Sequence, residues 1–137
     1  MPIKGQCLCG AVRYTISSTP LATRVCWCRL CQYLGAGNGT VNGMFKRDSV
    51  VIEGETRDYA SVADSGSHMH RQFCPICGTP MFGYADERAQ LLVVRVGTMD
   101  DPSAVPPATT IWTSQAPTWA CINGDLPQVG RQPPPIG

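Results

Sequence analysis

Seven of the eight cysteines of this chain lie in three tight groups, and their spacing constrains the fold more than any other feature of the sequence. The groups are Cys7-Leu8-Cys9, Cys26-Trp27-Cys28-Arg29-Leu30-Cys31 and Cys74-Pro75-Ile76-Cys77. Cysteines one or two residues apart are typical of thiolate ligands to zinc. Two pairs fill one closed tetrahedral site, whereas a group of three leaves one position open, and an open position is where metal chemistry takes place. The sequence therefore predicts two different zinc sites.

Eight cysteines can also form disulfides, which require an oxidising compartment. The start Met-Pro-Ile-Lys-Gly-Gln has no apolar signal core, and no run approaches the roughly 18 apolar residues that cross a bilayer. We therefore expect a cytoplasmic protein with reduced cysteines and no membrane association.

The length of 137 residues suits one modest hydrophobic core. The formal charge is +1, and seven thiolates with two zinc ions change it to about −2. Such a chain lacks the basic surface that binds nucleic acid or anionic membranes, so we expect neither as a partner. We predict one zinc-binding domain over residues 1–127 and a frayed, Pro/Gly-rich C-terminal tail over 128–137.

Short runs of Val, Ile, Thr and Tyr between many glycines and prolines predict a mainly β fold of short antiparallel strands with little helix. Residues 11–16 alternate, with Val12, Tyr14 and Ile16 on one face. Residues 49–53 and 56–60 flank Gly54-Glu55, which favours a two-residue hairpin.

Residues 91–96 form the longest apolar run, which predicts a central strand buried on both faces. A weaker strand is expected at 109–113.

The first predicted site consists of Cys7, Cys9, Cys74 and Cys77. Four thiolates leave no vacancy, so this zinc would be structural and would tie the first strand to the middle of the chain. A sharp turn must follow each pair, and Gly10 and Gly78 stand at these turns.

The second predicted site consists of Cys26, Cys28 and Cys31, whose zinc would keep a position for water or for an incoming thiol. The alternative is a second structural zinc closed by Cys121, His68 or His70. The two histidines face the same way if residues 67–73 form a strand. Trp27, between two ligands, is expected to shield the site rather than to stack on a substrate.

The motifs together resemble the glutathione-dependent formaldehyde-activating enzyme family, which includes centromere protein V. The resemblance runs from about residue 3 to Pro127 and rests on the following segments: Gly5-Gln6-Cys7-Leu8-Cys9-Gly10-Ala11-Val12, the triplet at 26–31, Arg71-Gln72-Phe73-Cys74-Pro75-Ile76-Cys77-Gly78, Gly97-Thr98-Met99-Asp100-Asp101-Pro102, Ser114-Gln115-Ala116-Pro117 and Trp119.

This resemblance implies a mostly β fold, a structural zinc on the two pairs and a labile, catalytic zinc on Cys26, Cys28 and Cys31. The implied activity joins glutathione to formaldehyde to give S-hydroxymethylglutathione, a carbon–sulfur lyase reaction. Many relatives have histidine between the first two triplet cysteines, where this chain has Trp27, which can neither relay a proton nor bind metal.

The sequence thus favours a zinc enzyme that activates a small thiol for addition to an aldehyde. Arg24, Arg29 and Arg71 are candidates to pair with the carboxylates of glutathione. Three other interpretations remain open: a non-catalytic two-zinc binding module, a related enzyme for another thiol adduct, and redox cycling of a Cys-x-x-Cys pair.

Overall fold

The computed structural model describes residues 2–136, and its strands confirm the mainly β prediction. The strands are β1 (Ile3–Gln6), β2 (Arg13–Ile16), β3 (Ala22–Cys26), β4 (Thr40–Lys46), β5 (Val50–Glu53), β6 (Arg57–Val62), β7 (His68–Phe73), β8 (Pro80–Ala85), β9 (Leu91–Arg95), β10 (Thr109–Ile111) and β11 (Gln128–Val129). A single α-helix, α1 (Arg29–Leu34), lies in the described part of the chain. Short 3-10 helices follow several strands: η1 (Arg47–Ser49), η2 (Asp86–Arg88), η3 (Val96–Thr98), η4 (Pro102–Ala104) and η5 (Thr113–Gln115).

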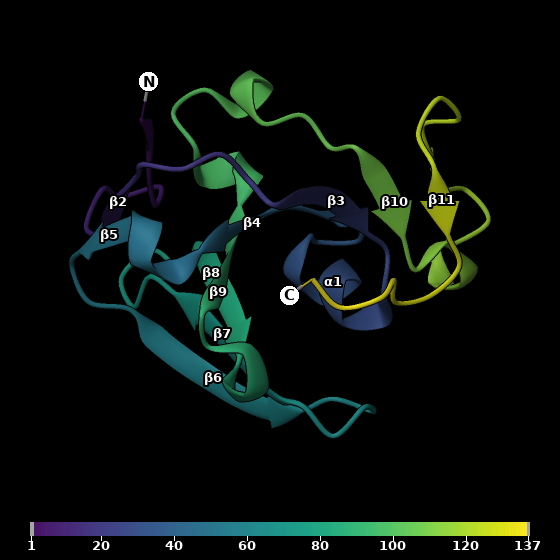
Figure 1. Cartoon of the computed structure of the whole chain (residues 1–137), viewed down its shortest axis with the longest axis horizontal. Coiled ribbons are helices and arrows are strands. Elements are labelled where there is room, and N and C mark those ends of the chain that lie inside the picture. The colour runs from purple at the N-terminus through teal and green to yellow at the C-terminus, as the bar shows by residue number, and fades with distance from the viewer. Residues whose placement is uncertain (1, 137) are drawn as a thin grey trace.

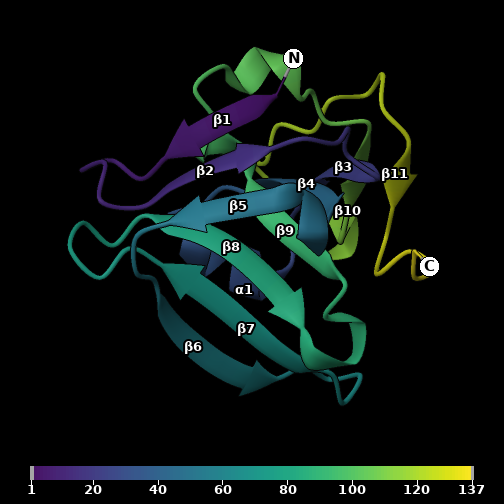
Figure 2. The same cartoon turned by 60° about the vertical axis from the view of Figure 1, so that its left-hand side comes forward.

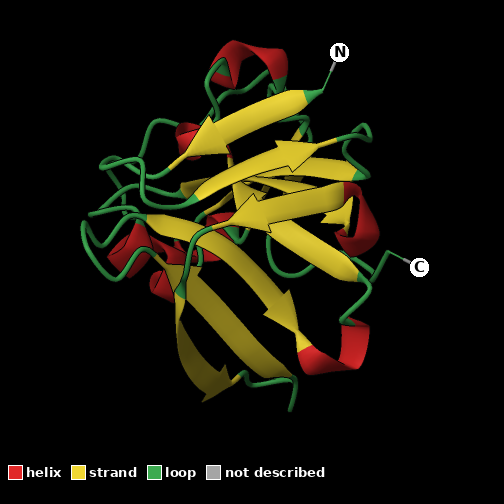
Figure 3. Ribbon diagram, turned by 90° about the vertical axis from the view of Figure 1, so that its left-hand side faces the viewer, coloured by secondary structure: helices red, strands yellow, loops and turns green. Residues whose placement is uncertain are grey.

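The strands form two sheets (Figures 1 and 3). The smaller has the order β1-β2-β5 and the larger the order β11-β10-β3-β4-β9-β8-β7-β6. Neighbouring strands are antiparallel except that β10 runs parallel to both β3 and β11. Figure 2 shows the small sheet in front of the large one and α1 behind it.

The main core lies between the two sheets. Val12, Tyr14 and Ile16 are buried on one face of the small sheet, as their alternation predicts. They share a buried cluster with Phe45 and Val94 of the large sheet. The opposite face of the large sheet is therefore free to carry α1 and polar side chains.

Residues 49–53 and 56–60 do not form the predicted hairpin. β5 pairs with β2 in the small sheet, whereas β6 pairs with β7 in the large one. Gly54 has a φ of 95°, but a Cβ there would also collide with the carbonyl oxygen of Ala11. The glycine thus permits a close backbone approach at the point where the chain passes from one sheet to the other.

β9 occupies a central position between β4 and β8, as expected for the longest apolar run. Leu92 and Val94 are buried, but Leu91, Val93 and Arg95 are only half-buried. The prediction of complete burial on both faces is therefore wrong, because the second face borders a cavity. The weaker strand is present as β10 and ends at Trp112, whose φ of 58° is left-handed.

Two elements depart from the expected pattern. Helix α1 was not expected at the triplet and has only six residues, too few to show helical periodicity. The tail was expected to be frayed, but Gln128–Val129 form β11 against β10, and the Gly130 carbonyl accepts a hydrogen bond from the Ser114 amide. The domain boundary at residue 127 stays a prediction. Among residues 2–136, no helix has the length and apolar character needed to span a membrane.

Candidate metal centres

The two cysteine pairs converge on one cluster. The Sγ atoms of Cys7, Cys9, Cys74 and Cys77 all lie within 4.8 Å of one another. Cys9 Sγ is 3.6 Å from Cys7 Sγ and 3.7 Å from Cys74 Sγ. Zinc–sulfur bonds of about 2.3 Å in a tetrahedron place two sulfurs about 3.8 Å apart. The four sulfurs therefore fit one tetrahedral zinc ion and are too far apart for disulfides.

Tight turns shape each half of this cluster. Gly10 and Gly78 have φ values of 81° and 76°, as the predicted turns require. Backbone amides point at the sulfurs, with Val12 N 3.3 Å from Cys7 Sγ and Ile76 N 3.4 Å from Cys74 Sγ. Such amide donors stabilise thiolate charge, which a metal ligand must carry.

Thr79 links the two turns, a role that the sequence did not indicate. Its hydroxyl oxygen accepts a hydrogen bond from the Leu8 amide at 3.1 Å and lies 3.1 Å from Cys77 Sγ. Hydrogen bonds from the Thr79 hydroxyl and amide lower the pKa of Cys77 to about 5. This contact favours the ionised thiolate at neutral pH.

The triplet forms a second cluster at the junction of β3 and α1. The Sγ atoms of Cys26, Cys28 and Cys31 lie within 4.8 Å of one another. Cys26 ends β3, Cys28 caps the N-terminus of α1, and Cys31 lies in the first turn. Cys28 Sγ accepts a hydrogen bond from the Cys31 amide at 3.3 Å. The three sulfurs thus lie together on a strand-to-helix turn.

The triplet favours one thiolate, on Cys31, while the pKa values of Cys26 and Cys28 are both raised. Hydrogen bonds from Cys26 and Cys28 lower the pKa of Cys31 to about 2, with smaller contributions from Thr40 and the positive charge of Arg95. The same hydrogen bonds raise the pKa of Cys26. Three cysteine sulfurs this close together are a donor set that suits a soft divalent metal such as zinc.

Gln32 fixes the loop that carries Cys28. Its buried side-chain amide donates to the Trp27 carbonyl at 2.8 Å and to the Gln115 carbonyl at 3.0 Å. Gln115 in turn accepts from the Arg29 amide, the first residue of α1, at 2.7 Å. Trp27 is 4% exposed and packs near Gly39, so its indole is not open for stacking on a substrate.

None of the three candidate fourth ligands joins the triplet among residues 2–136. His68 Nδ1 lies 2.8 Å from Glu87 Oε1, and His70 bridges two carboxylates. Cys121 is exposed and unpaired. The three-sulfur composition of this cluster therefore agrees with the predicted open site.

The arginine candidates have separate surroundings. Arg29 is exposed, stacks 5.3 Å above Tyr33 and donates to Gln32. Arg24 lies near Cys26 on β3, where burial lowers the pKa of its guanidinium. Arg71 Nη1 donates to Ser61 Oγ at 3.0 Å and lines a cavity.

Arg95 also lines this cavity and was missed from the sequence. The cavity, about 310 Å³ in volume, is bounded by Leu34, Arg71, Gln72, Phe73, Gly78, Pro80, Phe82 and Arg95. Arg95 lies close enough to the triplet for the thiolates to stabilise its charge, although burial lowers the pKa of its guanidinium. The sequence signal that could have indicated Arg95 is its place as the one charged residue at the end of the apolar run that forms β9.

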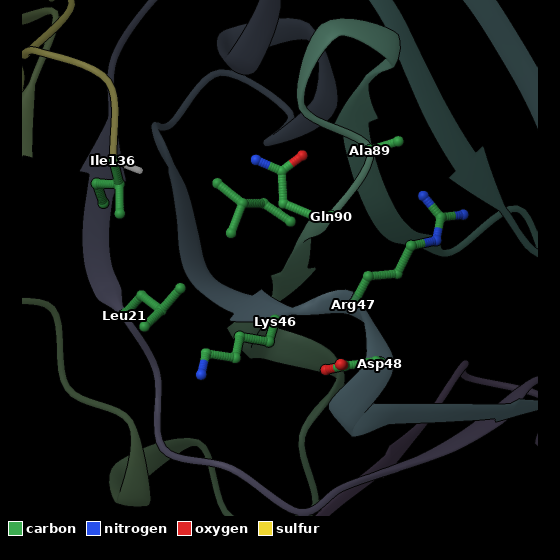
Figure 4. Close-up of a pocket in the computed structure, with 8 residues that line it drawn as sticks. Leu21, Lys46, Arg47, Asp48, Ala89, Gln90 and Ile136 are labelled. Atoms are coloured by element: carbon green, nitrogen blue, oxygen red, sulfur yellow. The ribbon is translucent and has the colours of Figure 1, made fainter.

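A larger hollow of about 670 Å³ contains no cysteine or histidine (Figure 4). Its lining residues are Leu21, Lys46, Arg47, Asp48, Ala89, Gln90, Leu91 and Ile136. Its size therefore does not make it the better candidate for metal chemistry.

Residues 2–115 match the family model of the glutathione-dependent formaldehyde-activating enzyme. The chain belongs to this family. The matched segment of the glutathione-dependent formaldehyde-activating enzyme family includes all seven clustered cysteines and stops before Cys121.

Two individual proteins are similar to this chain. A Halomonas elongata protein, provisionally named glutathione-dependent formaldehyde-activating enzyme, is 27% identical over 128 residues, which cover 89% of this chain and 82% of that protein. A crystal structure of a Rhodobacter sphaeroides protein has a TM-score of 0.57 at 17% identity and covers 91% of this chain and 98% of its own. The latter likeness supports the family fold alone.

Proposed function

We propose that the protein is a zinc-dependent carbon–sulfur lyase that adds glutathione, or a similar small thiol, to formaldehyde at Cys26, Cys28 and Cys31. The observation that carries this proposal is a three-sulfur cluster without a fourth protein ligand within 4.8 Å in the described chain. Its difference from the four-sulfur cluster supports a division into one catalytic and one structural site.

In this proposal, Cys7, Cys9, Cys74 and Cys77 hold a structural zinc, and the triplet holds a labile one. A zinc ion with an open position supplies Lewis acidity, which makes a thiol easier to ionise. The chain supplies the three thiolates and a fixed strand-to-helix turn that keeps them together.

The reaction is an addition that needs no oxidant or reductant. A sulfur–carbon bond forms, the carbonyl π bond of formaldehyde breaks, and the proton leaves the thiol sulfur and reaches the new hydroxyl oxygen. Buried Trp27 has only an N–H donor and cannot carry this proton. We therefore assign its transfer to solvent at the triplet, where Cys28 is only half-buried.

The unpaired cysteines suit a reducing compartment, and we propose that the protein acts in the cytoplasm. Fractionation of the source cells, with detection by an antibody against the protein, tests this location. Recovery from a secreted or periplasmic fraction would contradict it.

The decisive experiment compares wild type with Cys28→Ser and with Cys121→Ser as the matched control. Zinc per chain is measured before and after mild chelation, and proton exchange spectroscopy measures the rate of adduct formation from glutathione and formaldehyde. We expect two zinc ions in wild type and Cys121→Ser, and one ion, a retained fold and no rate acceleration in Cys28→Ser.

A wild-type protein that holds two equally resistant zinc ions and accelerates no thiol addition would instead be a non-catalytic binding module. Faster turnover of another hemithioacetal than of S-hydroxymethylglutathione would assign the site to a related thiol adduct. Either result would overturn glutathione-dependent formaldehyde activation.

A further inference from the structure

Arg71 and Arg95 line the same cavity, and neither has an acidic partner. In the described chain, every ion pair within 4.0 Å involves His68 or His70, so no carboxylate neutralises either guanidinium. Buried or half-buried arginines ordinarily have such partners, because desolvation of an unpaired charge is costly. The cavity therefore holds two guanidinium groups that no acidic side chain neutralises.

Arg95 is also incompletely hydrogen-bonded. Its Nη1 donates to Asn42 Oδ1 at 2.6 Å, but its buried Nε has no hydrogen-bond partner among the described residues. An orphaned buried donor costs free energy unless a ligand satisfies it. Nε itself has almost no accessible surface, so it adds to the cost of burying Arg95 without a carboxylate and is not itself a ligand contact.

The register of the large sheet places both arginines on the face that carries the triplet. Cys26 pairs with Thr40, and Arg95 with Asn42, two residues farther along β4. Directly paired residues in antiparallel strands, and residues two apart on one strand, share a face. The triplet and Arg95 therefore face the same way.

The same reasoning extends to Arg71 through Gly83. Gly83 of β8 pairs with both Arg71 of β7 and Val93 of β9, and Val93 lies two residues before Arg95. A Cβ on Gly83 would lie 3.5 Å from Arg95 Nη2, so the Arg95 guanidinium lies over Gly83 on this face. Leu34 of α1, the helix that also carries Cys31, is among the residues that line the cavity.

The charges of this face do not cancel. Three thiolates with one divalent zinc carry a net charge of about −1, which Arg95 can balance at close range. Arg71 then remains as a positive group in the cavity. A guanidinium recognises a planar carboxylate with two parallel hydrogen bonds.

We propose that this cavity binds a carboxylate of the thiol substrate, with Arg71 as the principal binding residue and Arg95 as the second. The inference rests on the proposed function and restricts its substrate class to small acidic thiols. Leu34 and Phe73 offer apolar surface to the chain that joins the carboxylate to the sulfur. The volume of about 310 Å³ is at the small end of ligand cavities, which suits part of a tripeptide.

The test separates binding from catalysis by using S-methylglutathione, whose sulfur carries no proton and cannot form a thiolate. Isothermal titration calorimetry measures its dissociation constant for wild type, Arg71→Gln and Arg71→Lys. Arg88→Gln is the matched control, because Arg88 is exposed on η2 outside the cavity. The diethyl ester of S-methylglutathione, which lacks both carboxylates, is the control ligand.

We expect Arg71→Gln to weaken S-methylglutathione binding by about ten- to a hundredfold, as for the loss of a charge-assisted hydrogen bond. Arg71→Lys should be intermediate, because it keeps the charge but loses the planar fork. Arg88→Gln should bind like wild type. The ester should bind weakly to all four proteins.

Equal binding of the acid and its ester to wild type, or equal binding of the acid to wild type and Arg71→Gln, would overturn the inference. Steady-state rates then distinguish this failure from failure of the proposed function. With glutathione, Arg71→Gln should raise KM with little change in kcat, whereas neutral 2-mercaptoethanol should react alike with both proteins. Acceleration of neither thiol by wild type would refute the enzyme itself, whatever the calorimetry shows.

Discussion

Cys9 Sγ and Cys74 Sγ lie 3.7 Å apart although the two residues are 65 positions apart in the sequence. A metal ion held by both therefore closes a long loop and joins the two turns across the edge of the main core. We expect Cys74→Ser to lower the free energy of unfolding by more than about 4 kcal/mol. Urea unfolding measures this, with Cys121→Ser as control, and a wild-type midpoint for Cys74→Ser would contradict the structural role of the cluster.

Gln32 should control how firmly the triplet is held. In Gln32→Ala, the Trp27 and Gln115 carbonyls lose their buried donor, which should cost about 1–3 kcal/mol of stability. The looser Cys28 loop should also release its metal to a chelator about tenfold more readily. Zinc release measured with a chromogenic chelator checks this, and Gln90→Ala on the surface should release metal like wild type.

Gly5 is required by close packing rather than by its backbone conformation. A Cβ at this position would collide with the Tyr14 hydroxyl and the Thr98 carbonyl oxygen. Gly5→Ala should therefore destabilise the protein by about 1–3 kcal/mol, as overpacking does. Thermal unfolding should show the loss, whereas Gly124→Ala, where a Cβ meets nothing within 4 Å, should keep the wild-type melting temperature.

His70 should make stability depend on pH. Its Nδ1 lies 2.6 Å from Asp58 Oδ2 and its Nε2 lies 2.9 Å from Asp86 Oδ1. The hydrogen bond to Asp58, and then the one to Asp86, raises the pKa of His70. Because the folded pKa lies above the unfolded one, the stabilisation is complete below the unfolded pKa of about 6.5 and is lost as pH rises through the folded pKa.

Urea unfolding of wild type and His70→Gln across this pH range measures the contribution, and NMR titration of the His70 ring reports its folded pKa. The stability difference between the two proteins should shrink as pH rises. A difference that stays constant with pH, or a folded pKa at or below 6.5, would contradict the role of the two carboxylates.

Local chemistry explains why the cysteine clusters could be predicted. Each pair or triplet lies within a single turn, so the spacing of Cys26, Cys28 and Cys31 already determines that their sulfurs can meet. The alternation of Val12, Tyr14 and Ile16 likewise reports one buried face directly.

Long-range pairing explains what could not be predicted. Gly54-Glu55 has the composition of a hairpin turn, yet its two flanking strands pair with β2 and β7 instead. Arg95 acquires its role from Asn42 on another strand, and Thr79 joins the two turns through the distant Leu8 amide. No pattern in Gln128–Val129 indicates that two residues will extend a sheet in parallel.

This last pairing has a consequence for self-association. β10 would otherwise be the outermost strand of the large sheet, with free amides and carbonyls able to template another copy. β11 occupies that position with only two residues, preceded by Pro127 and followed by three consecutive prolines at 133–135. Proline cannot donate hydrogen bonds to a neighbouring strand, so this edge of the sheet offers few free backbone groups to a second copy. The six-residue strand β6 at the opposite edge is therefore the more exposed template for strand addition.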